Sequence, residues 1–369
     1  MGRIRTFAAL GAATALLLGA CTGDDDDASD TTEQAGGGTD TTAASGGEPA
    51  ADDTLAAVQN AGVVRCGTRD DLPGFATLDA SGEYVGFDSD FCRVIAAAVL
   101  GDADAVEMVA LETDDRFTAL QSGEIDVLVR NTTWTATRDG TEGATFLMPT
   151  FYDGQGMMVA SDSGITDLDG LAGQVVCVAG GTTTEGNVAT EFTRLGLAAP
   201  EVLSFESVDL LQQAFEEDRC DGWSSDRSQL TGLRSAFPAG PEALTILEEV
   251  FSKEPLAPAV RDGDAAWAQA VEWAIAVTIL AEELGVDSTN VQEQLASTDP
   301  NVGRLLGVAV DGAVLDPGLG LAPDFALQVI TQVGNYGEIY DRNITPLGLE
   351  RGLNDLWTNG GLIYAPPYR

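Results

Sequence analysis

Hydrophobic and polar positions alternate along this chain in short blocks that favour strands and helices in succession. Apolar runs rich in β-branched side chains at residues 63–67, 106–111 and 125–129 are typical of buried parallel strands. Residues 88–100 and 115–121 have helical spacing, and the acidic residues that open the first of these helices can cap it. This order predicts βαβ units, and therefore an α/β fold with a mostly parallel sheet.

A second set of the same kind follows in the next hundred residues or so. Strands are expected at residues 175–179, 202–205 and 221–224, and helices are expected to begin near Thr182, Ser207 and Asp226. The two sets together predict two lobes, each built on its own sheet.

The chain is expected to cross between the lobes twice, at residues 149–156 and 250–258, and the second crossing contains two prolines. Lobe 2 would then span residues 151–256. Lobe 1 would be discontinuous, with residues 54–150 followed by 257–369. The apolar stretch after residue 265 has charged positions in helical rhythm, so it is expected to be a core helix of lobe 1.

The N-terminus indicates where the protein works. Two arginines precede an apolar run at residues 7–18, which is too short to span a bilayer and fits a secretory leader over residues 1–20. The following Leu-Gly-Ala-Cys sequence resembles a lipobox, in which Cys21 becomes the lipidated first residue. We therefore expect an extracytoplasmic protein held by a lipid at the outer face of the cell membrane. The alternative is a plain secreted protein.

Charge is the next strong feature. Residues 21–53 follow the leader, and residues 22–53 contain ten acidic residues and no basic one, which predicts a disordered acidic tether. The whole chain carries a formal charge of −41, which argues against nucleic-acid binding.

Four further cysteines remain, and an even number in an exported protein favours disulfides. Of the three possible pairings, Cys66–Cys92 and Cys177–Cys220 keep each bridge within one lobe, and free buried thiols are the alternative. The chain has no histidine and no Cys-x-x-Cys spacing. A zinc site is therefore not expected, and the commonest general base is missing.

The segment from residue 116 to residue 138 carries the clearest sign of a ligand site. It predicts a helix, a turn at Gly123, a buried strand, and then a loop rich in hydrogen-bond donors that ends at Arg138. Open α/β sheets bind ligands where parallel strands end, so this loop is expected to hold a small anion.

Ten short motifs in the same order resemble the general L-amino-acid-binding proteins of polar amino-acid ABC importers, over residues 55–369. They are LPGF (72–75), GFDSDFCR (86–93), DRFTALQSGE (115–124), RNTTWT (130–135), YDGQG (152–156), GTTTE (181–185), SKEPL (252–256), VGNYGEIY (333–340), RGLN (351–354) and LIYAPP (362–367). The resemblance implies the two-lobe periplasmic-binding protein type 2 fold, with a ligand cleft between the sheets. It also implies a monomer without cofactor, which captures free amino acids and delivers them to a membrane permease.

The resemblance also suggests roles for single residues. Arg138 would bind the ligand's α-carboxylate through its planar fork. Thr183 would complete that site at a helix N-terminus, although Thr182 and Glu185 also fit a capping box that needs no ligand. Asn131 and Thr133 would share the ammonium and carboxylate groups.

Asp226 matches the family's ammonium-binding aspartate, with a helix N-cap as its structural alternative. Leu72 and Trp134 would form apolar walls, although Trp134 could equally pack in the core. Arg69 departs from the small or neutral residue of relatives and would attract an acidic side chain such as that of glutamate or aspartate. The acidic residues that follow it could instead neutralise it, which would leave broad specificity for polar amino acids.

We therefore expect capture by lobe closure, with no catalytic residue and no metal. Two other functions use the same fold. A lipoprotein that senses its ligand would need the same pocket, and an enzyme such as a dehydratase would need catalytic groups that the sequence does not reveal.

Overall fold

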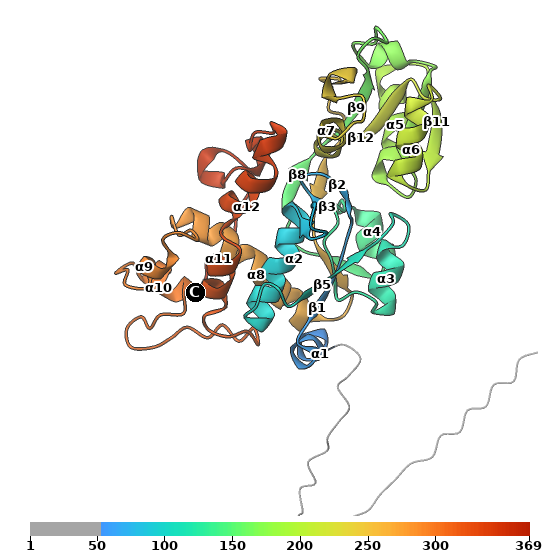
Figure 1. The fold of residues 1–369 in the computed structure, drawn as a ribbon. Coiled ribbons are helices and arrows are strands. Elements are labelled where there is room, and N and C mark those ends of the chain that lie inside the picture. Colours follow the sequence, from blue (N-terminus) through green and yellow to red (C-terminus); the bar gives the residue numbers. More distant parts are fainter. Residues whose placement is uncertain (1–52) are drawn as a thin grey trace, which may run out of the picture. The chain divides into compact units, whose positions relative to one another are not determined.

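The apolar runs form two separate five-stranded sheets in the computed structural model, which describes residues 53–369 (Figure 1). The expected leader, the lipidation site Cys21 and residues 22–52 of the expected tether lie outside the described residues. The two-lobe α/β fold predicted from the sequence is present. Lobe 1 denotes here the part built on the first sheet, and lobe 2 the part built on the second.

The first sheet has the strand order β5-β1-β6-β15-β7. β1 (Val64–Thr68) runs parallel to β5 (Val106–Ala110) and β6 (Val127–Leu128), as the βαβ pattern predicts. β15 (Ala259–Arg261) pairs antiparallel with both β6 and β7 (Ala144–Phe146), so it is reversed relative to its neighbours.

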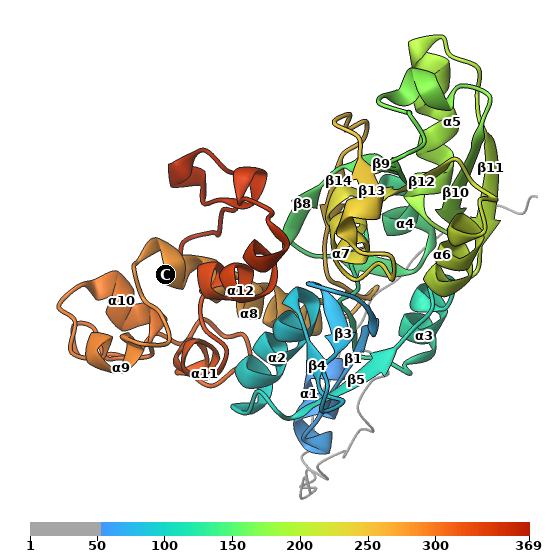
Figure 2. The ribbon, with the colours of Figure 1, turned by 45° about the horizontal axis from the view of Figure 1, so that its top comes forward.

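The second sheet has the order β11-β10-β12-β9-β13 and can be followed in Figure 2. β10 (Val175–Ala179) runs parallel to β11 (Glu201–Phe205) and β12 (Gly222–Asp226). β9 (Gln155–Ala160) pairs antiparallel with β12 and β13 (Leu244–Ile246), so it is the reversed strand of this sheet.

The reversed strands follow from how the chain passes between the lobes. β8 (Phe151–Asp153) leads into β9, β14 (Glu254–Leu256) leads towards β15, and β8 and β14 pair antiparallel with each other. A strand that arrives from the other lobe enters its sheet at the edge where the parallel strands end, and so runs against them. The two crossings therefore lie side by side.

Helices and a small sheet surround the two sheets. The elements of lobe 1 before the first crossing are α1 (Thr54–Ala61), β2 (Asp71–Leu72), β3 (Ala76–Leu78), β4 (Tyr84–Val85), α2 (Phe87–Leu100), α3 (Arg116–Ser122) and α4 (Ala136–Thr141). Those of lobe 2 are η1 (Leu168–Leu171), α5 (Thr183–Leu195), α6 (Val208–Glu216), α7 (Arg227–Ser235) and η2 (Pro241–Ala243).

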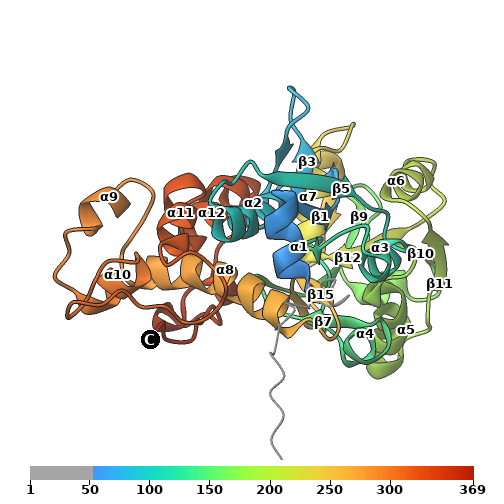
Figure 3. The same ribbon diagram turned by 90° about the horizontal axis from the view of Figure 1, so that it is seen from below.

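The expected core helix is α8 (Ala265–Glu283), which is largely buried against α2, α11 and α12 (Figure 3). Its first turn is capped by Asp264, whose carboxylate accepts the N–H of Trp267 at 3.0 Å. The remaining elements are α9 (Val291–Gln294), α10 (Pro300–Leu305), α11 (Phe325–Gln332), α12 (Tyr336–Asn343), η3 (Thr345–Leu347), η4 (Gly352–Asn354) and η5 (Trp357–Asn359).

The C-terminal elements hold the crossing strand β8. The side-chain oxygen of Asn354 accepts the N–H of Tyr152 at 2.6 Å, and its side-chain NH₂ donates to the carbonyl of Tyr152 at 3.1 Å. The hydroxyl of Tyr336 donates to the carbonyl of Thr150 at 2.8 Å. Asn354 therefore satisfies both the N–H and the carbonyl of Tyr152, much as a neighbouring strand would.

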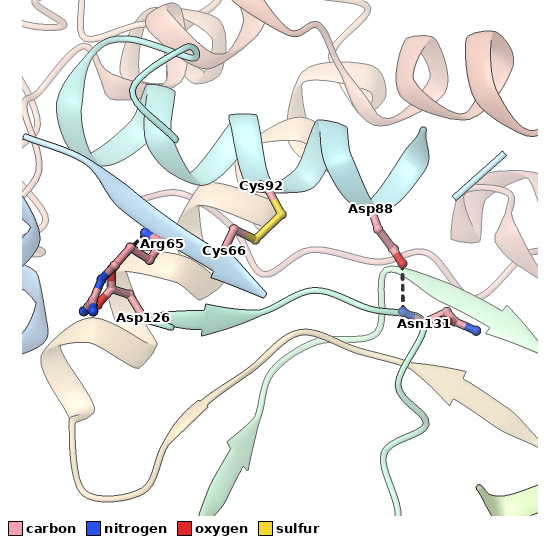
Figure 4. Close-up of a disulfide and its surroundings, with 6 residues drawn as sticks. All are labelled: Arg65, Cys66, Asp88, Cys92, Asp126 and Asn131. Carbon is pink, nitrogen blue, oxygen red and sulfur yellow. Dashed lines mark hydrogen bonds and ion pairs between the residues drawn. A yellow bond between two sulfur atoms is a disulfide. The ribbon is translucent and has the colours of Figure 1, made fainter. Parts of the chain in front are cut away.

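Both expected disulfides are present. Cys66–Cys92 joins β1 to α2 (Figure 4), and Cys177–Cys220 joins β10 to the loop before β12. Each bridge stays within one lobe, so it braces a sheet against its flanking segment and leaves the crossings free.

Three local predictions differ from the structure. α2 begins at Phe87 after Gly86 and its acidic residues do not cap it, because Asp88 accepts the N–H of Asn131 at 2.7 Å instead (Figure 4). β6 has two residues, where five were expected, because its pairing with β1 ends after Leu128. Arg138 lies in the short helix α4, where a loop was expected, since Thr135 accepts the backbone N–H of Arg138 and caps a turn.

No helix within residues 53–369 is long and apolar enough to cross a bilayer. Across the same residues, no group of three or more His, Cys, Asp or Glu side chains is arranged so that it could hold a metal ion.

Candidate functional site

A narrow polar cavity lies between the lobes, where strands of both sheets end. Lobe 1 lines it with Arg69, Arg116, Arg130, Asn131, Thr133 and Arg138, and lobe 2 lines it with Thr182, Thr183, Ser225, Asp226 and Gln229. The space open to the centre of a water molecule is about 30 Å³. That is room for about two water molecules, so a larger ligand requires the lobes to part and side chains to reorient.

The wall of the cavity in lobe 1 is strongly cationic. Its four guanidinium groups are all buried, and within the described residues only that of Arg69 forms an ion pair, with Asp71. Burial and, to a lesser degree, the nearby charge of Arg69 lower the pKa of Arg130 to about 9. Buried cations without an anionic partner are unfavourable, so this wall attracts negative charge.

Arg138 is positioned by α4. Its guanidinium donates to the carbonyl of Thr133 at 2.9 Å and, across the cleft, to the carbonyl of Gly181 at 3.3 Å. Burial lowers its pKa, while the charges of Glu254 and Asp226 raise it. Thr133 is itself held by a bridge to Leu256 at the end of β14, so the position of both residues depends on that crossing strand.

Arg69 directly follows β1 and is only 3% exposed. Besides its ion pair with Asp71, its Nη1 donates to the side-chain oxygens of Asn131 at 3.2 Å and of Gln229 at 3.4 Å. Its Nη2 is buried and has no hydrogen-bond partner in the described part of the chain. An unpaired guanidinium N–H in a cavity is a donor available to a ligand.

Asn131 makes hydrogen bonds within lobe 1 and to lobe 2. Its backbone has φ +28°, which is unusual for a residue other than glycine. The strained turn lets its N–H reach Asp88, whose pKa burial raises to about 7. The side-chain NH₂ of Asn131 donates to Gln229 at 3.2 Å, so this contact also joins lobe 1 to lobe 2.

Thr183 is the first residue of α5. Its hydroxyl donates to the carboxylate of Glu254 at 3.0 Å. The alternative capping box is not formed, because the hydroxyl of Thr182 donates to the carbonyl of Ala179 and Glu185 accepts from Ser204. The N-terminal N–H groups of α5 thus lack that side-chain cap and lie at the cavity.

Asp226 ends β12 and is buried at the lobe 2 side of the cavity. It stands at the N-cap position of α7, yet its side chain makes no cap hydrogen bond. Burial raises its pKa well above the usual value, and the nearby charges of Asp153 and Glu254 raise it further. A buried carboxylate in this state is stabilised by a nearby cation.

The two expected apolar walls lie elsewhere. Leu72 is fully buried beneath Gly232, where a Cβ on the glycine would lie 3.3 Å from the leucine side chain. Trp134 is 40% exposed, stacks on Phe146, and lines a separate surface groove. Neither side chain lines the cavity, in which polar groups predominate.

Sequence reasoning did not assign roles to Arg116, Arg130, Gln229 or Glu254. Arg116 carried a usable signal, because it is the first residue of α3, where the helix dipole disfavours a cation. Arg130 stands directly after the buried apolar run of β6, where a charged residue indicates a site. Gln229 and Glu254 gave no such signal, since their positions depend on how the lobes meet.

Comparison with known proteins places this architecture in a family. Residues 64–285 match the bacterial extracellular solute-binding proteins, family 3, and the chain belongs to that family. It is similar to the general L-amino acid-binding periplasmic protein AapJ of Rhizobium johnstonii, with 46% identity over 87% of this chain and 94% of that one. It is 44% identical to the glutamate/glutamine/aspartate/asparagine-binding protein BztA of Rhodobacter capsulatus, over 87% of this chain and 94% of that one.

A solved structure covers nearly the same region. It is an ABC transporter periplasmic binding protein from Brucella ovis with glutathione bound, 43% identical to this chain. The match has a TM-score of 0.83 and covers 86% of this chain and 99% of the other. The fold class expected from the sequence is thereby confirmed.

Proposed function

We propose that this protein captures free L-amino acids between its lobes and delivers them to the permease of an ABC importer. One observation carries the proposal: a cationic wall in lobe 1 and the buried carboxylate of Asp226 in lobe 2 line the same cavity. A free amino acid carries a carboxylate and an ammonium group, so it neutralises both walls at once. The names of the relatives, which bind amino acids, support the same function.

In this proposal Arg138 binds the α-carboxylate through its guanidinium fork, and the N–H groups at the start of α5, near Thr183, add further donors. Asp226 binds the α-ammonium group. Thr133 and Asn131 position these groups through the contacts described above. The ligand thus bridges both lobes and favours their closed arrangement, since only that arrangement satisfies all its polar groups.

The ligand side chain would lie toward Arg69. Its unpaired Nη2 and the amide of Gln229 suit a terminal carboxylate or carboxamide, and they disfavour lysine and arginine. The ion pair with Asp71 weakens this preference by partly neutralising Arg69. BztA, a relative named for binding glutamate, glutamine, aspartate and asparagine, fits the same chemistry.

The proposal includes the division of the chain. Residues 54–150 and 257–369 form lobe 1, residues 151–256 form lobe 2, and β8 with β14 act as the hinge. The protein would act as a monomer without catalytic activity. It would be tethered through a lipid on Cys21 to the outer face of the cell membrane, with the acidic segment as a spacer.

The first experiment is a calorimetric binding screen of the purified protein against the twenty L-amino acids and glutathione. Glutathione is included because its γ-glutamyl end carries the same carboxylate and ammonium groups as a free amino acid. Saturable binding of several amino acids is expected, with acidic or amide side chains bound most tightly. Failure to bind any amino acid would refute the proposal.

Two variants identify the site. Arg138→Ala should lower the affinity for every amino acid by tenfold or more, since charge-assisted hydrogen bonds contribute about 1.5–3 kcal/mol. Arg234→Ala, which removes an arginine in the last turn of α7, is the matched control and should bind as the wild type does. Equal affinities for both variants would contradict the carboxylate assignment.

A further inference from the structure

Arg116 contacts lobe 2 at the same atom as Arg138. The Nη2 atom of Arg116 lies 3.2 Å from the carbonyl oxygen of Gly181, and that of Arg138 lies 3.3 Å from it. Two guanidinium groups of lobe 1 therefore converge on one neutral oxygen of lobe 2. They meet it at the loop between β10 and α5, which also lines the cavity.

The rest of the Arg116 guanidinium is held in place by neutral groups. Its Nε donates to the carbonyl of Thr113 at 2.7 Å, and its Nη1 donates to the hydroxyl of Thr132 at 3.2 Å. That hydroxyl in turn donates to the carbonyl of Arg130 at 2.8 Å. This network sets the orientation of the planar group and points Nη2 across the cleft.

No carboxylate neutralises this cation. Arg116 is 3% exposed, and it forms no salt bridge among residues 53–369. Burial lowers its pKa, as do the charges of Arg138, Arg130 and Arg69, and Asp114 opposes this only at longer range. A buried cation without a counter-ion lowers the stability of the free protein, and a bound anion would offset that cost, so such a group is a candidate for ligand binding.

The approach of the lobes at this point is close. A Cβ on Gly181 would lie 1.9 Å from Oδ1 of Asp114, and Gly181 has φ +66°. Only glycine fits there, so its carbonyl can enter between the two arginines. A carboxylate makes charge-assisted hydrogen bonds about twice as strong as those to a neutral carbonyl. An anion reaching this point would therefore replace the Gly181 oxygen favourably.

We infer that Arg116 is a second guanidinium ligand of the amino acid's α-carboxylate, and that this carboxylate takes over the donors that here meet the Gly181 carbonyl. The inference rests on the proposed function and deepens it. It makes recognition depend on a full negative charge, because two cations share one carboxylate. A ligand with a carboxamide at that position would leave both cations without a counter-ion.

The test compares ligands that differ only at the α-carboxylate. L-Glutamate and its α-carboxamide L-isoglutamine are titrated by calorimetry into the wild type, Arg116→Gln and Arg116→Lys, with L-alanine and L-alaninamide as a second pair. Arg116→Gln should lower the affinity for the acid about ten- to hundredfold and the affinity for the amide by less than about threefold. Arg116→Lys keeps the charge and should show an intermediate loss for the acid.

The readings separate the possible failures. If Arg116 only supports the fold, acid and amide lose affinity by the same factor, and that result overturns the inference. Unchanged affinity for the acid overturns it as well. Wild-type protein that binds no amino acid refutes the proposed function together with the inference. Unfolding temperatures without ligand identify a variant that does not fold, in which case the acid-to-amide ratio of Arg116→Lys decides.

Discussion

Asp226 allows a prediction in which stability and binding move in opposite directions. Its carboxylate is buried at the cleft, with the like charges of Asp153 and Glu254 nearby. Within the described part of the chain its side chain accepts no cap hydrogen bond from α7. Asp226→Asn removes this charge while nearly preserving the shape of the side chain. We expect the variant to be more stable than the wild type and to bind amino acids poorly.

The size of both effects follows from the burial. Removing one buried charge that lacks a compensating partner stabilises the folded protein by about 1–3 kcal/mol. For a chain of this size, each kcal/mol of stability raises the unfolding temperature by roughly 2 °C. The unfolding temperature should therefore rise by about 2–6 °C at pH 7.5. Because the ammonium group loses its charged partner, the affinity for amino acids should fall by about ten- to hundredfold.

The stability gain should depend on pH with a definite sign. The folded-state pKa of Asp226 is raised above its value in the unfolded chain, which is about 3.9. The folded protein therefore holds the proton where the unfolded chain releases it. Ionisation of Asp226 then lowers stability progressively as the pH rises from about 4 through the folded-state pKa. The variant escapes this loss, so its advantage is small near pH 4 and largest above the folded-state pKa.

Differential scanning calorimetry of both proteins at pH 4 and pH 7.5, without ligand, measures this difference. Asp162→Asn changes an exposed carboxylate of the same lobe and is the matched control, with no shift expected at either pH. A lower unfolding temperature for Asp226→Asn at pH 7.5 would refute the reasoning. It would mean that the attraction of Arg138 and Arg69 for Asp226 outweighs its burial.

Three further predictions concern other parts of the molecule. Arg69→Ser should weaken glutamate and aspartate more than alanine in the calorimetric screen, and an unchanged ranking would limit Arg69 to a structural role. Asn354→Ala should lower the unfolding temperature by a few degrees, because two hydrogen bonds to β8 are lost, while the exposed Asn301→Ala should leave it unchanged. Replacing Cys177 and Cys220 by alanine opens a loop with a sequence separation of 43 residues, and should reduce the free energy of unfolding by about 2–4 kcal/mol in a denaturant titration; no reduction would contradict the predicted contribution of that bridge.

Much of the architecture was predictable because it rests on local patterns. β1, β5 and β10 agree with the expected ranges to within about a residue, since each carries β-branched residues that favour a strand, although β5 is an edge strand without a fully buried residue. Where pairing between distant segments decides the length, as in β6, the prediction was less accurate. Four cysteines allow three connectivities, and the fold has the one in which both bridges lie within a lobe.

Competition among polar side chains could not be read from the sequence. Thr182 and Glu185 have the spacing of a capping box, but the hydroxyl of Thr182 donates to the carbonyl of Ala179, three residues earlier, and Glu185 accepts from Ser204 on β11. Asp88 was expected to cap α2 and instead accepts the N–H of Asn131, in a loop 43 residues further on. A polar side chain that could cap a helix can be satisfied instead by another hydrogen-bond partner, either nearby in the chain or on another element.

The sequence by itself determined the α/β class, the two sets of βαβ units and the donor-rich segment that ends at Arg138. These features depend on the local spacing of apolar and polar residues. Only the tertiary structure brought Arg69 to Gln229, aimed Arg116 at Gly181, and kept Leu72 and Trp134 away from the cavity. Such contacts join residues of different lobes or elements, and they exist only once burial and hydrogen bonding have set how the two sheets and the hinge pack.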